Sequence, residues 1–345
     1  MKFGPVPLSQ AEGKILGHNI AGADGQRLLR KGKPLMAEDV SALHRMGRTS
    51  VYVAELEPGD VSENDAARRI AQAIGGPGLA FSGPSSGRAN LLAAALGIVR
   101  VEAGRLARVN EIEGITVATL RNHSAAHTRQ IVATVKIIPY AVPAGHVARA
   151  EAITSGKPII QLDPLPVRKV GLILSGSPSV RERIQADFDP PLRQRVKTLG
   201  SDIVAVEFVP LEDESGEQVL ARHLVEQARQ GMGLIILAGE TAIMDRNDIA
   251  PRAIEQAGGE VACVGAPVDP GNLLIVGYLG GVPILGAPGC ARSRKTNVVD
   301  WILPRLLAGD HLTRADIMTL GHGGLLDEIA ERPMPRNGQD YNRPA

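Results

Sequence analysis

The sequence predicts an α/β protein: a three-layer sandwich built on a mostly parallel sheet, preceded by a mixed α+β N-terminal domain. Two observations in the second half of the chain support this prediction. Short apolar runs rich in Val and Ile recur at strand length, at 169–174, 203–209, 234–238 and 261–266. Helix-like stretches separate these runs, at 189–199, 215–230 and 248–258. Strands that alternate with helices in this way form mostly parallel sheets with helices on both faces.

Capping residues support the predicted helices of this second half. Asp189 precedes two prolines, an arrangement typical of an N-cap followed by the first helical positions. Ser215 and Asp248 are the predicted N-caps of the next two helices. After residue 271 the pattern changes to a hairpin, which leads into a Gly/Pro-rich turn and an amphipathic helix at 293–308.

The first half of the chain shows weaker patterns. Residues 1–56 look rich in β-strands, with one helix near 37–46. Further helices are predicted at 61–74 and 87–96, and strands at 114–120 and 130–138. The stretch LDPLPVR at 162–168 has two prolines and no periodicity, and it is the predicted domain boundary. The predicted domains are a mixed α+β N-terminal domain at 1–166, the α/β domain at 167–328 and a disordered polar tail at 329–345.

Composition limits the classes of function. The chain has 345 residues, enough for two domains, and its 44% hydrophobic and 22% charged residues are typical of a globular protein. Its 38 basic and 37 acidic residues balance and only 3% of residues are aromatic, which argues against a nucleic-acid partner. Two cysteines argue against a secreted disulfide framework. Because it has no signal-peptide pattern and no long apolar run, the sequence predicts a cytoplasmic protein without a membrane span.

The strongest candidate site is GAPGCARSRK at 286–295, where a predicted strand turns into a helix that starts near Ser293. Free N–H groups and the positive end of the helix dipole at such a start bind anions. Gly289 allows a ligand to approach the backbone. Side-chain donors follow, at Arg292, Ser293, Arg294 and Lys295. The alternative is a tight strand-to-helix turn that carries a solvated basic patch.

The second candidate is LAGETAIMDRNDIAP at 237–251, which also joins a strand end to a helix start. Asp245 and Asp248 stand three residues apart within it. Carboxylate oxygens are suitable ligands for Mg²⁺ at a phosphate site, and these two aspartates would then be the catalytic and metal-binding residues. In the alternative interpretation Asp248 is only an N-cap and Asp245 is solvated.

The third candidate is SGSPS at 175–179, directly after the first strand of the α/β domain. Its small hydroxyl residues and Gly176 are suited to the polar edge of a ligand. Ligands of open α/β sheets bind at the carboxyl ends of the strands. Because all three candidate loops follow strands of one sheet, they are predicted to converge on one crevice.

Other signals are weaker. SGPSSG at 82–87 has no following GK[ST], so it is interpreted as a connector rather than a Walker loop. His123 and His127 lack the intervening glutamate of a metalloprotease motif, so a metal role is not favoured. Cys290 lies inside the strongest anion loop; it is either a reactive thiol with a lowered pKa or simply a small residue that fits.

Three segments together point to a known family: LILSGS, ILAGETAIMDRNDIAP and ILGAPGCARS. In this order they make residues 169–309 resemble the molybdopterin-binding domain shared by molybdopterin adenylyltransferase, molybdopterin molybdotransferase and gephyrin. The PGCARS loop is similar to that of a bacterial group described as molybdopterin-binding. The resemblance implies an α/β sandwich that holds the pterin and its phosphate, sometimes with a nucleotide and Mg²⁺. Carried over by motif, the expected cofactor-binding residues are Ser175, Gly176, Ser177, Gly239, Glu240, Thr241, Pro288, Gly289, Cys290, Arg292 and Ser293.

The resemblance implies binding of molybdopterin or the molybdenum cofactor, in biosynthesis or handling of that cofactor. Ser177 replaces the acidic residue of the family's T-G-D-E motif and Ala238 replaces the first glycine of G-G, which favours binding over nucleotide transfer. The alternatives are a Mg²⁺-dependent nucleotidyltransferase or molybdenum insertase acting on molybdopterin, and a nucleotide pyrophosphate hydrolase. Implied partners are a cofactor nucleotidyltransferase or a molybdoenzyme, and the family favours a homo-oligomer.

Overall fold

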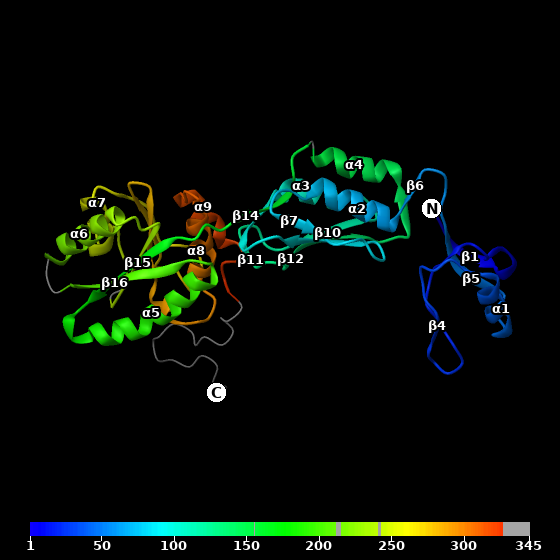
Figure 1. Ribbon diagram of the computed structural model, residues 1–345, viewed down its shortest axis with the longest axis horizontal. Coiled ribbons are helices and arrows are strands. Elements are labelled where there is room, and N and C mark those ends of the chain that lie inside the picture. Colours follow the sequence, from blue (N-terminus) through cyan, green and yellow to red (C-terminus); the bar gives the residue numbers. More distant parts are fainter. Residues whose placement is uncertain (155, 212–214, 241–242, 327–345) are drawn as a thin grey trace, which may run out of the picture. The chain divides into compact units, whose positions relative to one another are not determined.

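The computed structural model describes the chain except for residues 155, 212–214, 241–242 and 327–345 (Figure 1). Its architecture is mixed α/β, as predicted. The chain forms two compact units, Met1–Asp163 and Pro164–Ala345. The tail predicted to be disordered, at 329–345, lies outside the described residues. No described helix combines the length and the apolar character needed to cross a lipid bilayer.

Small antiparallel sheets and four described α-helices build the first unit. Its strands are β1 Lys2–Pro7, β2 Ile15–Leu16, β3 Ile20–Ala21, β4 Arg27–Leu29, β5 Ser50–Glu55, β6 Asp60–Ser62, β7 Leu79–Phe81, β8 Arg88–Ala93, β9 Gly97–Val101, β10 Ile115–Thr119, β11 Ala125–Ala126, β12 Ile131–Ile137, β13 Ala141–Pro143 and β14 Ile160–Pro164. Its helices are the 3₁₀ turn η1 Leu8–Gln10 and the α-helices α1 Ala37–Arg45, α2 Glu63–Ile74, α3 Ala103–Asn110 and α4 Ala144–Thr154. The predicted helices near 37–46 and at 61–74 correspond to α1 and α2.

The main core of this unit lies between α2 and the antiparallel sheet β10-β12-β8-β7. Ala66, Ile70 and Ile74 recur at helical spacing on α2 and are fully buried. Leu91 of β8 and Val135 of β12 are fully buried in the same cluster. The amphipathic pattern of α2 therefore places this helix on the sheet.

The helix predicted at 87–96 is wrong. This segment forms β8, which pairs with β12 and β7. Its buried residues, Ala89, Leu91 and Ala93, alternate with more exposed ones, which is the period of a strand and not of a helix. The strands predicted at 114–120 and 130–138 correspond to β10 and β12.

The second unit is built on one six-stranded sheet. Its strands are β15 Lys169–Gly176, β16 Asp202–Pro210, β17 Leu234–Gly239, β18 Glu260–Val264, β19 Ile275–Leu279 and β20 Val282–Gly286. Its α-helices are α5 Arg181–Thr198, α6 Ser215–Arg229, α7 Ile249–Gln256, α8 Val298–Ala308 and α9 Arg314–Met318, and its 3₁₀ turns are η2 Pro178–Val180, η3 Gly289–Arg292 and η4 Thr319–Gly321. The strand order is β16-β15-β17-β20-β19-β18, with β16, β15, β17 and β20 parallel and the last two pairings antiparallel.

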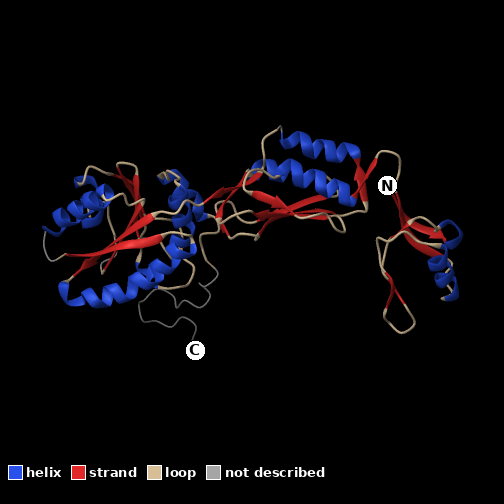
Figure 2. Ribbon diagram, in the orientation of Figure 1, coloured by secondary structure: helices blue, strands red, loops and turns tan. Residues whose placement is uncertain are grey.

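The order of these strands in the sequence places helices on both faces of the sheet. From β15 the chain reaches one neighbour, β16, through α5, and then crosses through α6 to β17 on the other side of β15. Because crossovers between parallel strands are right-handed, opposite directions of travel put the two helices on opposite faces. Figure 2 shows α5 on one side of the strands and α6 and α7 on the other.

The predicted start of α5 is wrong. The helix begins at Arg181, so Asp189 and the two prolines after it lie inside the helix instead of at its N-terminus. The side chain of Asp189 therefore caps no N–H group; it accepts a hydrogen bond from Arg193 Nε at 3.0 Å, one turn later. Ile184 and Phe188 are buried at helical spacing before the prolines, and this earlier apolar face extends the helix.

Candidate functional site

The three candidate loops follow neighbouring parallel strands of the second unit. In the strand register, Ser175 of β15 lies opposite Gly239 of β17, and Leu237 of β17 lies opposite Gly286 of β20. The three strands therefore end at the same edge of the sheet. The amide N–H of Ala287 also donates to the carbonyl oxygen of Leu237 at 2.8 Å, and this hydrogen bond joins the third loop to β17. The structure thus brings together the loops that the sequence placed at strand ends.

The first and second loops are in direct contact. Glu240 Oε2 accepts hydrogen bonds from the backbone N–H and from the hydroxyl of Ser177, each at 3.0 Å. These two bonds, the backbone one first, together with the Arg183 guanidinium at 3.6 Å, hold the pKa of Glu240 below its usual value. The backbone N–H of Glu240 also donates to the carbonyl oxygen of Ser175 at 2.9 Å. The carboxylate of Glu240, from the second loop, thus lies at the first loop, where Ser177 stands in place of an acidic residue.

Two glycines permit this close contact. A Cβ atom added at Gly239 would lie 2.4 Å from Ser175 Oγ, and one added at Gly176 would lie 2.9 Å from Glu240 Cβ. Both distances are too short for a side chain without movement of the neighbour. Gly176 and Gly239 therefore have a packing reason to be glycine, and no ligand is needed to explain them.

Asp245 and Asp248 hold the turn before α7 together. Asp248 Oδ2 accepts the backbone N–H groups of Met244 at 2.6 Å and of Asp245 at 2.9 Å. Asp245 Oδ1 accepts both the backbone N–H and the side-chain amide of Asn247 at 2.8 Å. The backbone N–H of Asn247, followed by its side-chain amide, lowers the pKa of Asp245. Asp248 is the residue before α7, but its side chain bonds the preceding turn and not the helix.

These carboxylates do not form a built metal site. Among the described residues, no group of three or more His, Cys, Asp or Glu side chains is placed to hold a metal ion. One oxygen of each aspartate is already used by two N–H groups, so the pair fits Mg²⁺ poorly. The catalytic and metal roles of Asp245 and Asp248 stay predictions. Thr241, also predicted to contact the cofactor, lies outside the described residues.

A cavity of about 220 Å³ opens between the first two loops and the α6–α7 side of the sheet. Its polar lining comes from the strand ends and from the start of α7, at Ser175, Gly239 and Asp248. Apolar side chains line the rest, among them Leu211 and Ile243. A small, mostly apolar cavity with a few polar groups is suited to a ring with polar edges.

The third loop differs from the sequence prediction. Helix α8 begins at Val298 and not near Ser293, and a separate 3₁₀ turn, η3, occupies Gly289–Arg292. Asn297 Oδ1 accepts the N–H of Val299 at 3.0 Å, and Asp300 Oδ2 accepts the N–H of Asn297 at 2.8 Å. This reciprocal capping box satisfies donors at the helix start. The N-terminus of α8 is therefore capped by its own side chains, and the anion cradle expected in the loop at 286–293 stays a prediction.

The backbone of the third loop is held from outside by Arg195 of α5. The Arg195 guanidinium donates to the carbonyl oxygens of Ala291 at 3.1 Å, Ser293 at 2.8 Å and Lys295 at 3.0 Å. It also pairs with Asp300 at 2.9 Å, and its side chain is only 9% exposed. Sequence reasoning missed Arg195, because no local pattern distinguishes it from the other basic residues of α5.

The side chains of the third loop are partly committed as well. Arg292 Nε donates to the carbonyl oxygen of Gly289 at 3.0 Å, its Nη1 lies 3.6 Å from Asp187, and its guanidinium lies over the Phe188 ring. Ser293 Oγ accepts the N–H of Lys295 at 3.1 Å. Pro288 is buried, and Cys290 is half-buried in the η3 turn. What remains open to a ligand is the half-buried backbone around Gly289 and the exposed cation at Arg294, for which the described part of the chain records no partner.

A family model matches one part of the chain. It is described as a domain of unknown function (DUF8806), and it covers residues 5–55, in the first unit. No curated protein matches the sequence. This match is too short to show which family the whole chain belongs to.

Solved structures with some likeness to the chain are proteins of molybdenum cofactor biosynthesis. The molybdopterin biosynthesis enzyme MoaB from Thermus thermophilus is 19% identical over 42% of this chain and 98% of its own, with a TM-score of 0.30. A molybdenum cofactor biosynthesis protein from Pyrococcus furiosus is 13% identical over 92% of this chain and 65% of its own, with a TM-score of 0.24. A molybdopterin biosynthesis MoeA protein from Pyrococcus horikoshii is 14% identical over 89% of this chain and 75% of its own, with a TM-score of 0.29.

Proposed function

We propose that the second unit binds molybdopterin or the molybdenum cofactor, and that the protein serves in the biosynthesis or handling of that cofactor. One observation carries the proposal: the loops after β15, β17 and β20, which bear the three family-like segments, lie at one edge of the parallel sheet. Ligands of open α/β sheets bind at this edge. In this proposal the unit is the three-layer sandwich of the molybdopterin-binding family.

The polar groups at this edge suit the two ends of such a ligand. A pterin ring carries hydrogen-bond donors and acceptors on its edge, and the cavity beside Ser175 and Gly239 offers polar groups among apolar walls. The terminal phosphate is an anion, and the third loop offers Arg294 beside the open backbone at Gly289. Arg195 holds this loop in one conformation, so little conformational entropy is lost when a ligand binds.

Binding is favoured over catalysis in this proposal. Phosphoryl transfer depends on a metal ion and on free carboxylates to position it. Asp245 and Asp248 instead accept backbone N–H groups of their own turn. The nucleotidyltransferase, insertase and pyrophosphate hydrolase alternatives therefore have no specific contact in their favour. In this proposal the protein acts in the cytoplasm as a homo-oligomer, and it passes the cofactor to a nucleotidyltransferase or a molybdoenzyme.

A direct titration with molybdopterin tests binding. Gly289→Ala is the informative variant, because the added Cβ meets only Arg292 Nη2, at 3.5 Å, and the fold tolerates it. If the ligand approaches this backbone, the substitution weakens binding about tenfold or more, measured by calorimetry. Gly145→Ala, in open space on α4, is the matched control and leaves affinity unchanged. Absence of molybdopterin binding by the folded wild-type protein contradicts the proposal.

A second experiment separates a binding protein from an enzyme. The protein is incubated with molybdopterin, Mg²⁺ and ATP or CTP, and pyrophosphate and nucleotidylated pterin are measured. The proposal expects tight pterin binding and no product. Product formation that is abolished by Asp245→Asn would instead establish the nucleotidyltransferase alternative.

A further inference from the structure

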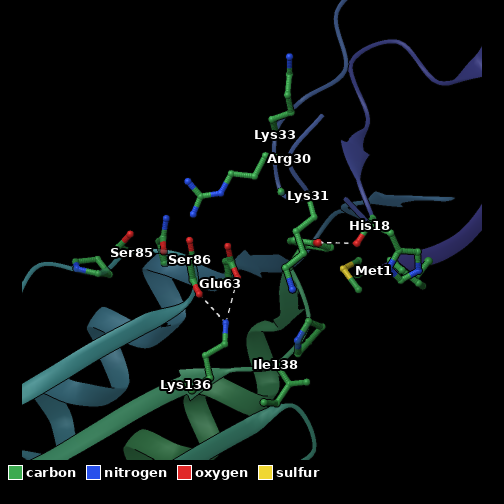
Figure 3. A pocket seen from close by; sticks show the side chains of 17 residues that line it. Met1, His18, Arg30, Lys31, Lys33, Glu63, Ser85, Ser86, Lys136 and Ile138 are labelled. Atoms are coloured by element: carbon green, nitrogen blue, oxygen red, sulfur yellow. Dashed lines mark hydrogen bonds and ion pairs between the residues drawn. The ribbon is translucent and has the colours of Figure 1, made fainter. Parts of the chain in front are cut away.

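A second cavity, of about 940 Å³, lies within the first unit. Segments far apart in the sequence line it: residues 30–33 after β4, and the Ser85–Ser86 turn between β7 and β8. Glu63 at the start of α2 and Lys136 near the end of β12 also line it, and Figure 3 shows these side chains around the opening. The SGPSSG segment, which the sequence predicts to be only a connector, lies in the wall of a cavity through Pro84, Ser85 and Ser86.

The walls of this cavity are held together by specific contacts. The Tyr140 hydroxyl donates to the carbonyl oxygen of Gly17 at 2.8 Å, which joins residues 123 positions apart. The N-terminal amino group of Met1 pairs with Asp60 at 2.8 Å and with Glu57 at 3.0 Å. These contacts join the segments that bear lining residues of the cavity.

Positive charge dominates the lining. Arg30, Lys31, Lys33 and Lys136 line the cavity, and Glu63 is the only acidic side chain among its lining residues. Lys33 is paired with Asp39 at 2.8 Å, and Lys136 lies 3.7 Å from Glu63. Arg30 and Lys31 are exposed, and neither forms an ion pair within the described part of the chain. Asp39 and Glu63 offset Lys33 and Lys136, so the charges of Arg30 and Lys31 give the concave surface a net positive charge that attracts an anion.

The two cations differ in direction. In Figure 3, the Arg30 guanidinium extends from the segment after β4 towards the Ser85–Ser86 turn, while Lys31 extends towards Ile138. Lys33 points away from both. Arg30 and Lys31 therefore reach the cavity from one wall, opposite hydroxyl groups on the other wall.

The Ser85–Ser86 turn presents these hydroxyls in a fixed geometry. Ser86 has a φ of 50°, and its carbonyl oxygen accepts a hydrogen bond from Lys136 Nζ at 2.6 Å. The next residue, Gly87, donates its N–H to Asn64 Oδ1 at 2.9 Å. Both serine side chains are exposed, and the described residues offer neither hydroxyl a hydrogen-bond partner. They are free to donate to an oxyanion.

Apolar side chains lie uncovered next to the charges. Ile138 is 63% exposed and Phe3 is 47% exposed, and both line the cavity. The cavity is also far larger than an inorganic phosphate ion and falls in the range of pockets for small organic ligands, about 300–1,000 Å³. An ion alone would leave most of this space and the apolar wall unused.

We propose that this cavity binds a phosphomonoester of a small organic molecule. Arg30 and Lys31 hold the phosphate group, with the hydroxyls of Ser85 and Ser86 as further donors. The organic part of the ligand covers Phe3 and Ile138. The site lies in a different unit from the loops proposed to bind molybdopterin, and it does not depend on that proposal.

Phenyl phosphate is the probe, since it joins a phosphate group to a flat apolar body. Inorganic phosphate lacks the apolar body, and phenol lacks the phosphate group. We expect phenyl phosphate to bind at least about tenfold more tightly than either one, in calorimetric titrations of the full chain at fixed salt concentration. A protein that binds inorganic phosphate as tightly as phenyl phosphate holds a simple anion site, and this result overturns the phosphomonoester class.

Three variants locate the binding. Arg30→Gln and Lys31→Gln remove charge at exposed positions, and each is expected to weaken phenyl phosphate binding about tenfold. Arg27→Gln is the matched control, because Arg27 is an exposed cation on β4 that does not line the cavity. Unchanged affinity in the Arg30→Gln, Lys31→Gln double variant, with an unchanged melting temperature, overturns the proposed site. Gly289→Ala should leave phenyl phosphate binding unaffected, which keeps this test separate from that of the second unit.

Discussion

Arg195 in the second unit and Arg30 in the first carry the same charge in opposite surroundings. Arg195 is almost buried, pairs with Asp300 and donates to three carbonyl oxygens of the loop after β20. Arg30 is exposed at a cavity and has no acidic partner in the described structure. An enclosed and paired guanidinium holds backbone in place, whereas an unpaired one at a concave surface is available to a ligand. A positive charge alone therefore does not identify a binding site. Whether the cation already has an acidic or carbonyl partner in the fold is what distinguishes the two cases.

The same contrast holds for the carboxylates. Glu240, Asp245 and Asp248 stand in the segments that resemble a known family, yet all three accept hydrogen bonds from the loops of that same sheet edge. The cavity of the first unit contains one carboxylate, Glu63, among several cations. The loops at the carboxyl ends of β15, β17 and β20 are thus held by their own hydrogen bonds. Cations without an acidic partner in the described structure lie instead at the cavity of the first unit.

The largest expected effect is that of Arg195→Met. Removing this guanidinium leaves Asp300 without its cation and the carbonyl oxygens of Ala291 and Ser293 without this donor, so we expect the free energy of unfolding to fall by about 2–4 kcal/mol. Arg30→Gln, with no partner to lose, should change it by less than about 0.5 kcal/mol. Urea denaturation of the two variants measures both values.

Arg195→Lys is the control for this comparison. Lysine keeps the charge but cannot reach several carbonyl oxygens with one planar fork, so a smaller loss is expected than for Met. If Arg195→Met and Arg30→Gln cost the same, the view that Arg195 holds the loop is wrong.

A second prediction concerns a buried polar group without a partner. Gln227 is fully buried, and neither its Oε1 nor its Nε2 atom finds a hydrogen-bond partner within the described structure. A Cβ atom added at Gly171 would lie 1.9 Å from this Oε1. Gly171→Ala is therefore expected to cost about 1–3 kcal/mol of stability through overpacking.

A double-mutant cycle tests this explanation. Combining Gly171→Ala with Gln227→Ala removes the clashing amide, so the pair should be more stable than the sum of the two single effects predicts. Additive effects would mean that Gly171 is required for another reason. Thermal or urea unfolding of the four proteins gives the coupling.

A third prediction tests the start of α8. Asn297→Ala removes the side chain that accepts the N–H of Val299, and it should cost about 1 kcal/mol or somewhat more, because Asn297 is only 1% exposed. Asn297→Asp keeps the accepting oxygen and should cost less. Equal losses would show that the side-chain amide, which donates to the carbonyl oxygen of Lys295, matters more than the cap.

Continuous apolar runs made the second unit the easier half to predict. β15 and β17 are buried on both faces, so their sequences read as near-continuous apolar runs rich in Ile and Leu. The alternation of β8 spans only three buried residues, which is too short to distinguish a strand from the helix that its sequence predicts. The true start of α8 is marked by the capping box of Asn297 and Asp300, a weaker signal in the sequence than the PGCARS segment before it.

Contacts between distant residues could not be predicted. The carboxylate of Glu240 reaches Ser177 across 63 positions, and Arg195 reaches the loop after β20 across nearly 100. The basic cavity joins residues 30–33 to a serine turn more than 50 positions away. Each of these depends on tertiary packing that leaves no periodic or local trace in the sequence.

The smallest expected effect concerns Glu240 and depends on pH. Its contact with Ser177 holds the pKa of Glu240 below the usual 4.5, so this contact stabilises the folded protein above that pH, and the stabilisation is lost as pH falls towards the folded-state pKa. Glu240→Gln removes the titration. Between about pH 6 and about pH 3.5, the free energy of unfolding should therefore fall more for the wild type than for Glu240→Gln. Identical pH profiles would mean that the first two loops are not joined through this carboxylate. The loops at the carboxyl ends of β15 and β17 would then be less pre-organised than the contrast with the cavity of the first unit assumes.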